Sequence, residues 1–266
     1  IADPQERFQD FLKSDKYRER LSRMAVAGSY SLTVDFEDLL TTDSALAESI
    51  LEKPDEYLEH ANHAALAQLQ IEEPAYAEAV ETVTVRFRGL PETLPLRTLG
   101  SEHIGKLIMV EGIIVRATPV RPLVTQGAFK CKRCGIITYV DQVGPFLRFP
   151  TECSDPACKR RGPFDFLQEE STFIDSQEIR IQELPEDLPP GQLPRWIEVK
   201  LEGKDIVDVA RPGDHVSVVG ILRAEAPTLP QVGKLRLFIL HLDTNFIDVV
   251  SKEPEAVLIS PEEEKQ

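Results

Sequence analysis

Two short cysteine pairs, Cys131-Lys-Arg-Cys134 and Cys153-Ser-Asp-Pro-Ala-Cys158, lie 18 residues apart and contain all four cysteines of the chain. Each pair predicts a turn that directs two thiolates to one point, and Gly135 suits the first of these turns. Four soft, anionic sulfur ligands in this spacing are typical of a tetrahedral zinc site. We therefore predict a zinc ribbon over residues 128–172 that holds one structural Zn²⁺ per chain.

Other roles for the cysteines agree less well with the sequence. Structural disulfides are rare in intracellular proteins, and here every cysteine lies in one short segment. A thioredoxin-like pair requires a βαβ context, whereas the flanking residues predict strands. A catalytic zinc needs an open coordination position and usually histidine, and the five histidines are far from the cysteines in sequence. Four free, buried cysteines remain the alternative.

The sequence around the cysteine segment predicts short β-strands. From Val83 to Arg88 apolar residues alternate with Thr84, Arg86 and Arg88, so these three side chains are expected to face outward. Further strands are predicted at residues 107–115, 177–182, 196–201, 215–222 and 235–248. Gly112 and Gly220 suit sharp bends within two of them. Short strands without helices between them predict a small barrel or sandwich.

The first third of the chain predicts helices instead. Apolar residues from Phe8 to Met24 recur at steps of three and four residues, which places them on one helix face. Thr42 or Asp43 can cap a helix over residues 45–53, and Pro54 can open the next one. The last residues again predict the start of a helix, and we expect a further domain to follow them.

The net charge of the chain does not show whether it binds nucleic acid. With 30 basic and 45 acidic residues the formal net charge is −15, and phosphate contacts require Lys and Arg. Acidic residues dominate the helical third and the tail, whereas cations cluster in the middle, for example from Lys130 to Arg133. An acidic protein can still carry a basic groove.

No motif predicts catalysis. The stretch Gly100-Ser-Glu-His-Ile-Gly105-Lys106-Leu107 approaches a phosphate-binding loop, but Leu107 lacks the required hydroxyl and a strand is predicted to follow. No nucleophile signature occurs elsewhere, so we expect this chain not to be an enzyme. No apolar run approaches the roughly 20 residues of a membrane span. The start also lacks the features of a signal peptide, and we expect a soluble, cytoplasmic protein without membrane contacts.

The combination of a helical region, a domain of short strands and an inserted four-cysteine ribbon resembles the N-terminal region of the MCM (minichromosome maintenance) helicases of archaeal type. The stretches that carry the resemblance include Ile104-Gly-Lys-Leu-Ile-Met-Val-Glu-Gly-Ile-Ile-Val-Arg116, Ala128–Cys131, Gln177–Glu183, Pro190–Arg195 and Leu201–Val216. The similarity is strong from Arg97 onward and looser before it. The family ribbon more often ends with C-x2-C, so the C-x4-C pair here departs from the pattern.

This resemblance implies an α+β multidomain fold. A helical bundle (1–82) precedes an OB-fold β-barrel in two parts (83–127 and 173–250). The zinc ribbon (128–172) is inserted between these two parts. A linker (251–266) then leads to an AAA+ ATPase domain. It implies a hexameric ring, single or double, that encircles DNA and grips single strands, with double-stranded DNA as a further ligand. The alternatives are a free-standing OB-fold and zinc-ribbon protein that binds single-stranded nucleic acid, and an enzyme that uses the P-loop-like stretch or the zinc.

The resemblance also implies the residues that contact DNA. The positions that match the inner face of the family barrel are Arg116, Arg121, Arg180 and Arg195. A hairpin in the channel, at about residues 222–238, would add Arg223, Lys234 and Arg236.

Two of these arginines also stand out from the residues around them. Arg116 ends an apolar strand, and Arg180 lies between Ile179 and Ile181, which predicts an outward side chain. A lone arginine is more often a solvated surface residue, whereas four on one face would form a groove for phosphates. We expect little aromatic stacking, because Trp196 is the only tryptophan and is a candidate core residue.

Overall fold

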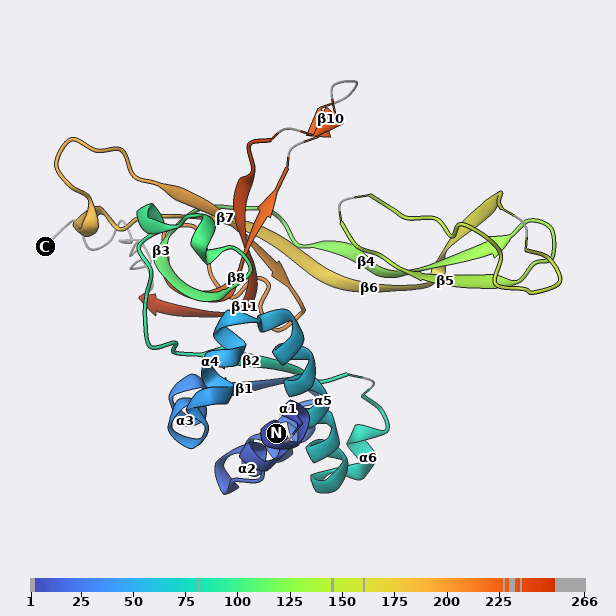
Figure 1. The fold of residues 1–266 in the computed structure, drawn as a ribbon, viewed down its shortest axis with the longest axis horizontal. Helices are drawn as coiled ribbons and strands as arrows, with labels where there is room; N and C mark the ends of the chain where they lie inside the picture. The colour runs from blue at the N-terminus through green and yellow to red at the C-terminus, as the bar shows by residue number, and fades with distance from the viewer. Residues whose placement is uncertain are drawn as a thin grey trace, which may run out of the picture. The chain divides into compact units, whose positions relative to one another are not determined.

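The computed structural model describes residues 3–80, 82–144, 146–159, 161–226, 228–229, 233–234 and 236–251, with side chains for all of these except 228–229, 233–234 and 251. The chain forms two compact units (Figure 1). The first unit comprises residues 1–118, 178–201 and 208–266, and the second comprises residues 119–177 and 202–207.

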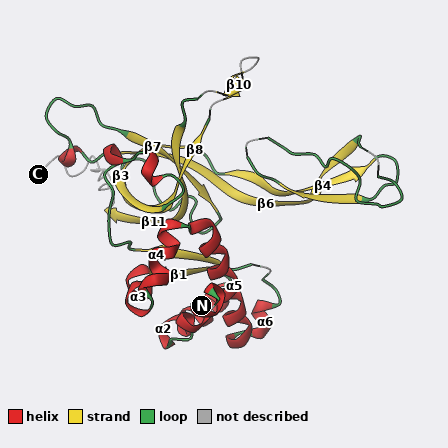
Figure 2. Ribbon diagram, in the orientation of Figure 1, coloured by secondary structure: helices red, strands yellow, loops and turns green. Residues whose placement is uncertain are grey.

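The first unit begins with a helical region (Figure 2). Its helices are α1 (Pro4–Leu12), α2 (Asp15–Ala27), α3 (Phe36–Thr42), α4 (Ser44–Glu52), α5 (Pro54–Glu72) and α6 (Pro74–Ala77). Asp43 caps α4 by accepting a hydrogen bond of 3.1 Å from the N–H of Leu46, and Pro54 occupies the first turn of α5, as predicted. The helices bury the side chains of Tyr17, Leu21 and Phe36, among others, in one apolar core.

Two strands belong to this helical region. Strand β1 (Ser31–Asp35) pairs in parallel with β2 (Thr84–Arg88) in a sheet of their own, so β2 lies with the helices although the sequence assigned it to the barrel. The prediction that Arg86 faces outward was wrong, because its side chain is buried and its Nη1 donates a hydrogen bond of 2.8 Å to the carbonyl of Asn245. Helix α5 and strand β11 both contact β2, which agrees with the burial of Arg86.

Most of the other strands of the first unit form a larger sheet, here called the OB sheet. They are β3 (Leu107–Ala117), the last residues of β6 (Phe164–Gln182), β7 (Trp196–Glu202), β8 (His215–Glu225) and β11 (Ile239–Ser251). Strand β8 is antiparallel to β3 and β11, and β11 is parallel to β7. Strand β3 also pairs with β6, and a side chain at Gly112 would collide with the carbonyl of Gln182. The glycine at this position therefore permits a close approach of β6, whereas the sequence predicted a sharp bend there.

The helical region and the OB sheet share one core. Leu107, Val219 and Ile221 of the sheet belong to the same buried cluster as the helical side chains, and Met109 and Phe246 pack against it. Burial of this continuous apolar surface fixes the sheet on the helices. No helix in the described part of the chain has both the length and the apolar character needed to cross a membrane.

The second unit is a smaller, strand-rich element. Strand β4 (Arg121–Cys131) pairs antiparallel with β5 (Ile137–Asp141) and with the first residues of β6. Its core is small: the buried Phe129 ring packs against Phe149 and Phe166, with ring centres 4.9 and 5.6 Å apart. The sequence predicted strand-like residues beside the cysteines, but it gave no bounds for β4 or for the first part of β6.

A short hairpin connects β8 and β11. Strands β9 (Thr228–Leu229) and β10 (Gly233–Lys234) are antiparallel, within the region that the sequence assigned to a channel hairpin. The strand predicted over residues 235–248 instead begins at Ile239 and continues to Ser251.

Candidate metal centre and nucleic-acid interface

The four cysteines of the second unit converge, as predicted. Their sulfur atoms all lie within 4.8 Å of one another. The Sγ atoms of Cys131 and Cys158 are 3.9 Å apart, and those of Cys134 and Cys153 are 3.5 Å apart. A tetrahedral site with metal–sulfur bonds of about 2.3 Å separates its sulfurs by about 3.8 Å. The donor set and its spacing therefore fit a zinc ion.

Local turns aim the sulfurs at this point. In the first pair, Gly135 has a φ of 78°, and its N–H donates to the carbonyl of Cys131 at 2.9 Å. In the second pair, the carbonyl of Asp155 accepts from the N–H groups of Cys158 and Lys159 at 3.1 and 3.0 Å. The longer C-x4-C spacing is thus accommodated by a turn around Asp155.

The thiols have unequal acidity. The N–H groups of Cys134 and Arg133 lower the pKa of Cys131 to about 7. The N–H of Asp155 lowers the pKa of Cys153, but burial and hydrogen bonding with the thiols of Cys134 and Cys131 outweigh it and raise this pKa to about 12. Without a cation at their centre, one thiolate therefore suppresses ionisation of its neighbour, and four thiolates require a positive ion between them.

Two of the predicted DNA-contacting arginines lie side by side on the OB sheet. Arg116 of β3 is the cross-strand partner of Arg180 of β6. The side chain of Arg116 is exposed, and within the described residues it has no carboxylate at ion-pair distance. Ile179 and Ile181 are buried, so Arg180 faces outward as predicted.

The guanidinium of Arg180 has two partners on β7. Its Nε donates to Oε1 of Glu198 at 2.9 Å, and its central carbon lies 3.9 Å from the ring centre of Trp196. Trp196, Glu198 and Lys200 alternate with buried residues of β7 and so share the outward face. This face therefore combines arginine, aromatic and carboxylate groups.

Arg195 and Arg121 have different surroundings. Arg195 is exposed; its backbone N–H donates to the carboxylate of Glu183 at 3.0 Å, and its Nη1 donates to the carbonyl of Arg97 at 3.2 Å. Arg121 belongs to the second unit, where it is exposed at the start of β4 opposite Ser176. Arg116, Arg180 and Arg195 all belong to the first unit.

The hairpin arginines differ from one another. Arg223 on β8 donates to Asp55 of α5 at 2.8 Å and to Asp243 of β11 at 3.2 Å. The hydrogen bond with Asp55 is the main cause that raises the pKa of Arg223. Arg236 is exposed, whereas the side chain of Lys234 lies outside the described residues. Arg223 thus already has two carboxylate partners within the protein.

Comparison with known proteins identifies the family. The model of the MCM N-terminal domain matches residues 5–89, and the model of the MCM OB domain matches residues 95–226. The chain belongs to the MCM family. Within this family of replicative helicases it corresponds to the N-terminal region.

Named relatives agree with this assignment. The minichromosome maintenance protein MCM of Saccharolobus solfataricus is 35% identical, over 95% of this chain and 37% of its own length. DNA replication licensing factor mcm2 of Xenopus laevis is 31% identical, over 81% of this chain and 25% of its own. DNA replication licensing factor MCM6 of Arabidopsis thaliana is 34% identical, over 80% of this chain and 27% of its own. The MCM chain therefore spans 25–37% of the length of these relatives.

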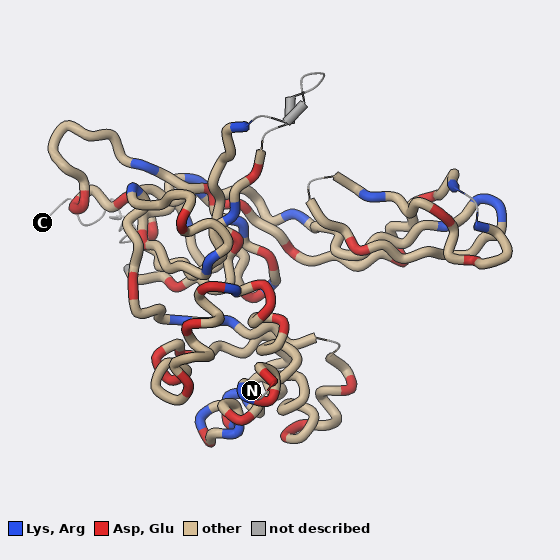
Figure 3. The backbone as a smooth tube through the Cα atoms, in the orientation of Figure 1, with Lys and Arg blue, Asp and Glu red and all other residues tan. Residues whose placement is uncertain are grey.

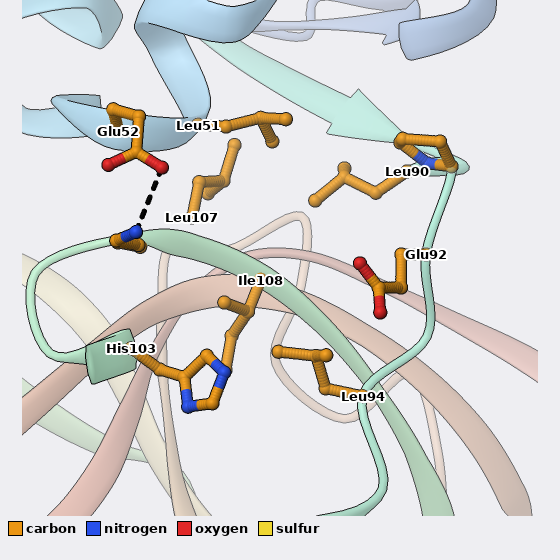
Figure 4. A pocket seen from close by; sticks show the side chains of 10 residues that line it. Leu51, Glu52, Leu90, Glu92, Leu94, His103, Leu107 and Ile108 are labelled. Carbon is orange, nitrogen blue, oxygen red and sulfur yellow. Dashed lines mark hydrogen bonds and ion pairs between the residues drawn. The ribbon is translucent and has the colours of Figure 1, made fainter. Parts of the chain in front are cut away.

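The P-loop-like stretch of the MCM chain has a structural role. Figure 4 shows the cavity beside it, of about 270 Å³, with Glu52 joined by a dashed line to the amine of Lys106, at 2.9 Å. The stretch leads into strand β3 at Leu107, as predicted, whereas a phosphate-binding loop leads into a helix. Lys106 therefore pairs with helix α4.

Trp196 is the residue that sequence analysis misjudged at this interface. It was a candidate core residue, but its side chain is 50% exposed. The signal was present in the sequence: Ile197, Val199 and Leu201 alternate along β7, which places Trp196 on the opposite, outward face. Aromatic character at this interface is consequently greater than predicted.

Proposed function

We propose that this MCM region grips single-stranded DNA by its phosphates. The contacts lie on the exposed side of an OB-fold barrel, and this side faces the channel of a hexameric ring that encircles DNA. One observation carries the proposal. Arg116 is exposed, lies opposite Arg180 and has no carboxylate partner among the described residues. Because Arg180 is paired with Glu198, Arg116 is the arginine of this pair whose charge is available to a bound phosphate.

The surroundings of Arg116 support the same function. The chain has 45 acidic residues, so an unpaired arginine is not explained by a shortage of carboxylates. Arg195 offers a second exposed guanidinium on the same unit. Cations along a groove give binding that is largely independent of base sequence and sensitive to salt. Arg121, Lys234 and Arg236 are proposed as further contacts, and Arg223 only if DNA displaces Asp55 or Asp243.

Barrel closure is part of this proposal. Strand β3 pairs with β8 along most of its length and with β6 at its end, while β11 connects β8 to β7. Strand β7 is in turn the neighbour of β6, and this circular order of strands supports a small closed barrel. The outward arginines of β3 and β6 would then share one strip of its surface.

We further propose one structural zinc ion per chain, held by Cys131, Cys134, Cys153 and Cys158. The convergence of the four sulfurs within 4.8 Å and the low pKa of Cys131 support it. Such an ion neutralises the thiolates and fixes the turns of the ribbon. It would supply no chemistry, because all four coordination positions are taken by protein.

The ring, its pairing into a double ring and a downstream AAA+ motor are proposed from family membership. Light scattering of the purified chain, with and without DNA, tests the ring. A mass of six chains supports it. A monomer at high protein concentration under both conditions favours a free-standing single-strand binder instead. Because the net charge is −15 per chain, assembly should weaken at low salt.

A salt titration tests the DNA grip. The double variant Arg121→Ala/Arg195→Ala should bind a fluorescent single strand less tightly at low salt. Because two phosphate contacts are lost, the slope of log affinity against log salt should fall by about 1.4. The double variant Arg18→Ala/Arg23→Ala, which changes the charge equally on helix α2, is the control. Unchanged affinity and slope in the first variant would place the site elsewhere, most simply on the hairpin.

A further inference from the structure

The only tryptophan of the chain leaves half of its surface open to solvent. Trp196 begins β7, and the side chains of Ile197 and Val199 next to it are buried on the other face of the strand. Exposure of so large an apolar ring is costly in water, and tryptophan is enriched where a partner covers it. The ring therefore marks a contact surface.

One face of the ring is covered by a fixed cation. The guanidinium carbon of Arg180 lies 3.9 Å from the ring centre, and the Nε of the same group donates to Glu198 at 2.9 Å. The carboxylate holds the guanidinium, and the guanidinium holds the indole through a cation–π contact. No other ring or cation contact with Trp196 occurs within the described residues, and its 50% exposure leaves ring surface on which a partner can pack.

We propose that the open face of Trp196 stacks on one base of the bound single strand, with Arg180 as the residue that positions the indole. This inference rests on the proposed DNA grip and adds a base contact to it. Every nucleobase has a π-face, so such a contact tolerates any sequence. Two exposed cations nearby would bind phosphates of the same strand: Arg195 precedes Trp196 in the chain, and Arg116 lies opposite Arg180.

In this arrangement Arg180 and Arg116 have different roles. The charge of Arg180 is already opposed by Glu198 at 2.9 Å, so this arginine contributes little to phosphate neutralisation. Arg116 has no carboxylate partner in the described part of the sheet. Arg116→Ala should therefore reduce the salt slope, whereas Arg180→Ala should weaken binding to normal strands with little change in slope.

The test uses the intrinsic fluorescence of the whole chain, since Trp196 is the only tryptophan. The probes are an oligo-dT strand of about 16 nucleotides, within the site size of an OB-fold, and an abasic strand of equal length and charge. We expect oligo-dT to quench the emission and the abasic strand to bind more weakly without quenching. Trp196→Leu should lower affinity for oligo-dT about tenfold and leave affinity for the abasic strand unchanged. Trp196→Phe, which retains a ring, should lose less.

The outcomes distinguish the stacking of a base on Trp196 from the phosphate binding on which this inference rests. Equal quenching by both strands, or equal affinities of parent and Trp196→Leu for oligo-dT, would overturn the stacking contact. If Arg116→Ala still weakened binding, the phosphate grip would stand without it. If the parent bound neither strand, both proposals would fail. Should Trp196→Leu fold poorly, the quenching comparison on the parent decides the question by itself.

Discussion

Arginine has different partners in the helical region and on the OB sheet. All four arginines of residues 3–80 pair with carboxylates: Arg7 with Asp43, Arg18 with Glu72, Arg20 with Asp35 and Arg23 with Glu19. The OB sheet holds both kinds of arginine. Arg180 and Arg223 pair with carboxylates there as well. Arg116 has no such partner in the described residues, and the guanidinium of Arg195, just before β7, donates to a carbonyl. Figure 3 shows acidic residues recurring along helices α3 to α5.

This difference separates two uses of the same side chain. A paired arginine lowers the energy of the fold, and its charge is already compensated within the protein. An unpaired, exposed arginine in an acidic chain leaves its charge available to a ligand. The comparison therefore predicts which substitutions change stability and which change DNA binding.

Loss of the proposed zinc ion should have the largest effect on stability. It should leave the paired arginines of the helical region and the unpaired arginines of the OB sheet in place. Cys131→Ser, or strong chelation, should unfold the ribbon of residues 128–172, because metal binding to such sites contributes about 10–16 kcal/mol in apparent terms. The helical region and the OB sheet have their own core and should keep their structure.

Metal analysis with hydrogen exchange on both units checks this result. Ser154→Ala, beside Cys153, is the matched control and should retain one zinc per chain. Protein that contains no zinc when purified without chelator would contradict the metal site.

Loss of Asp35 should destabilise the helical region next most strongly. Its carboxylate pairs with Arg20 at 2.7 Å, Lys16 at 2.8 Å and Arg88 at 2.6 Å. Asp35→Ala should lower the free energy of unfolding by about 2–3 kcal/mol, because three cations lose a charged partner. Single-strand affinity should not change.

Urea unfolding and oligonucleotide binding measure the two effects of Asp35→Ala. Glu37→Ala removes the same charge from an exposed neighbour and should be close to neutral. Loss of DNA affinity without loss of stability would contradict the division between paired and unpaired arginines.

The same carboxylate should make stability depend on pH. Burial alone would raise the pKa of Asp35, but hydrogen bonds from Lys16, Arg88 and Arg20 outweigh it and lower the pKa. Because the folded pKa lies below the unfolded value of about 3.9, this contribution is present above pH 4 and is lost as pH falls through the folded pKa.

Unfolding at a series of pH values between 7 and 3 checks the direction. Asp35→Asn should be less stable than the parent at neutral pH and should lose less stability on acidification. A parallel decline of the two proteins would show that other carboxylates cause the acid sensitivity.

The smallest effect is expected for an exposed pair. Arg18 and Glu72 are 2.8 Å apart, but the arginine side chain is 50% exposed. Arg18→Ala should change the free energy of unfolding by less than about 1 kcal/mol, since solvent screens such pairs. Thermal unfolding measures this change. A loss of stability as large as that of Asp35→Ala would show that the exposure of an ion pair does not determine its contribution to stability.

Features set by local pattern could be predicted from the sequence. The alternation of Ile179 and Ile181 placed Arg180 outward, and Asp43 before a periodic stretch predicted a capped helix. The cysteine spacing predicted the convergence of four sulfurs, because each pair requires only a turn of a few residues. In each case neighbours in the chain determine the structure.

Features set by distant contacts could not be predicted. Arg86 was expected to be outward, but Asn245, far along the chain, accepts its hydrogen bond within a covered sheet. Strand β4 carries Pro122 and Gly127, which weaken any strand pattern, and pairing with β6 supplies the hydrogen bonds that propensity does not. The Trp196–Arg180 contact joins two strands whose register the sequence does not reveal.

The most direct test of the DNA grip compares two arginines of equal charge, Arg116 on the OB sheet and Arg23 on helix α2. Single-strand affinity of the two alanine variants should be measured by fluorescence anisotropy from about 50 to 200 mM salt. We predict that Arg116→Ala binds more weakly at low salt, with a slope reduced by about 0.7, and that Arg23→Ala matches the parent. Equal behaviour of the two variants would contradict the assignment of DNA binding to the unpaired arginine.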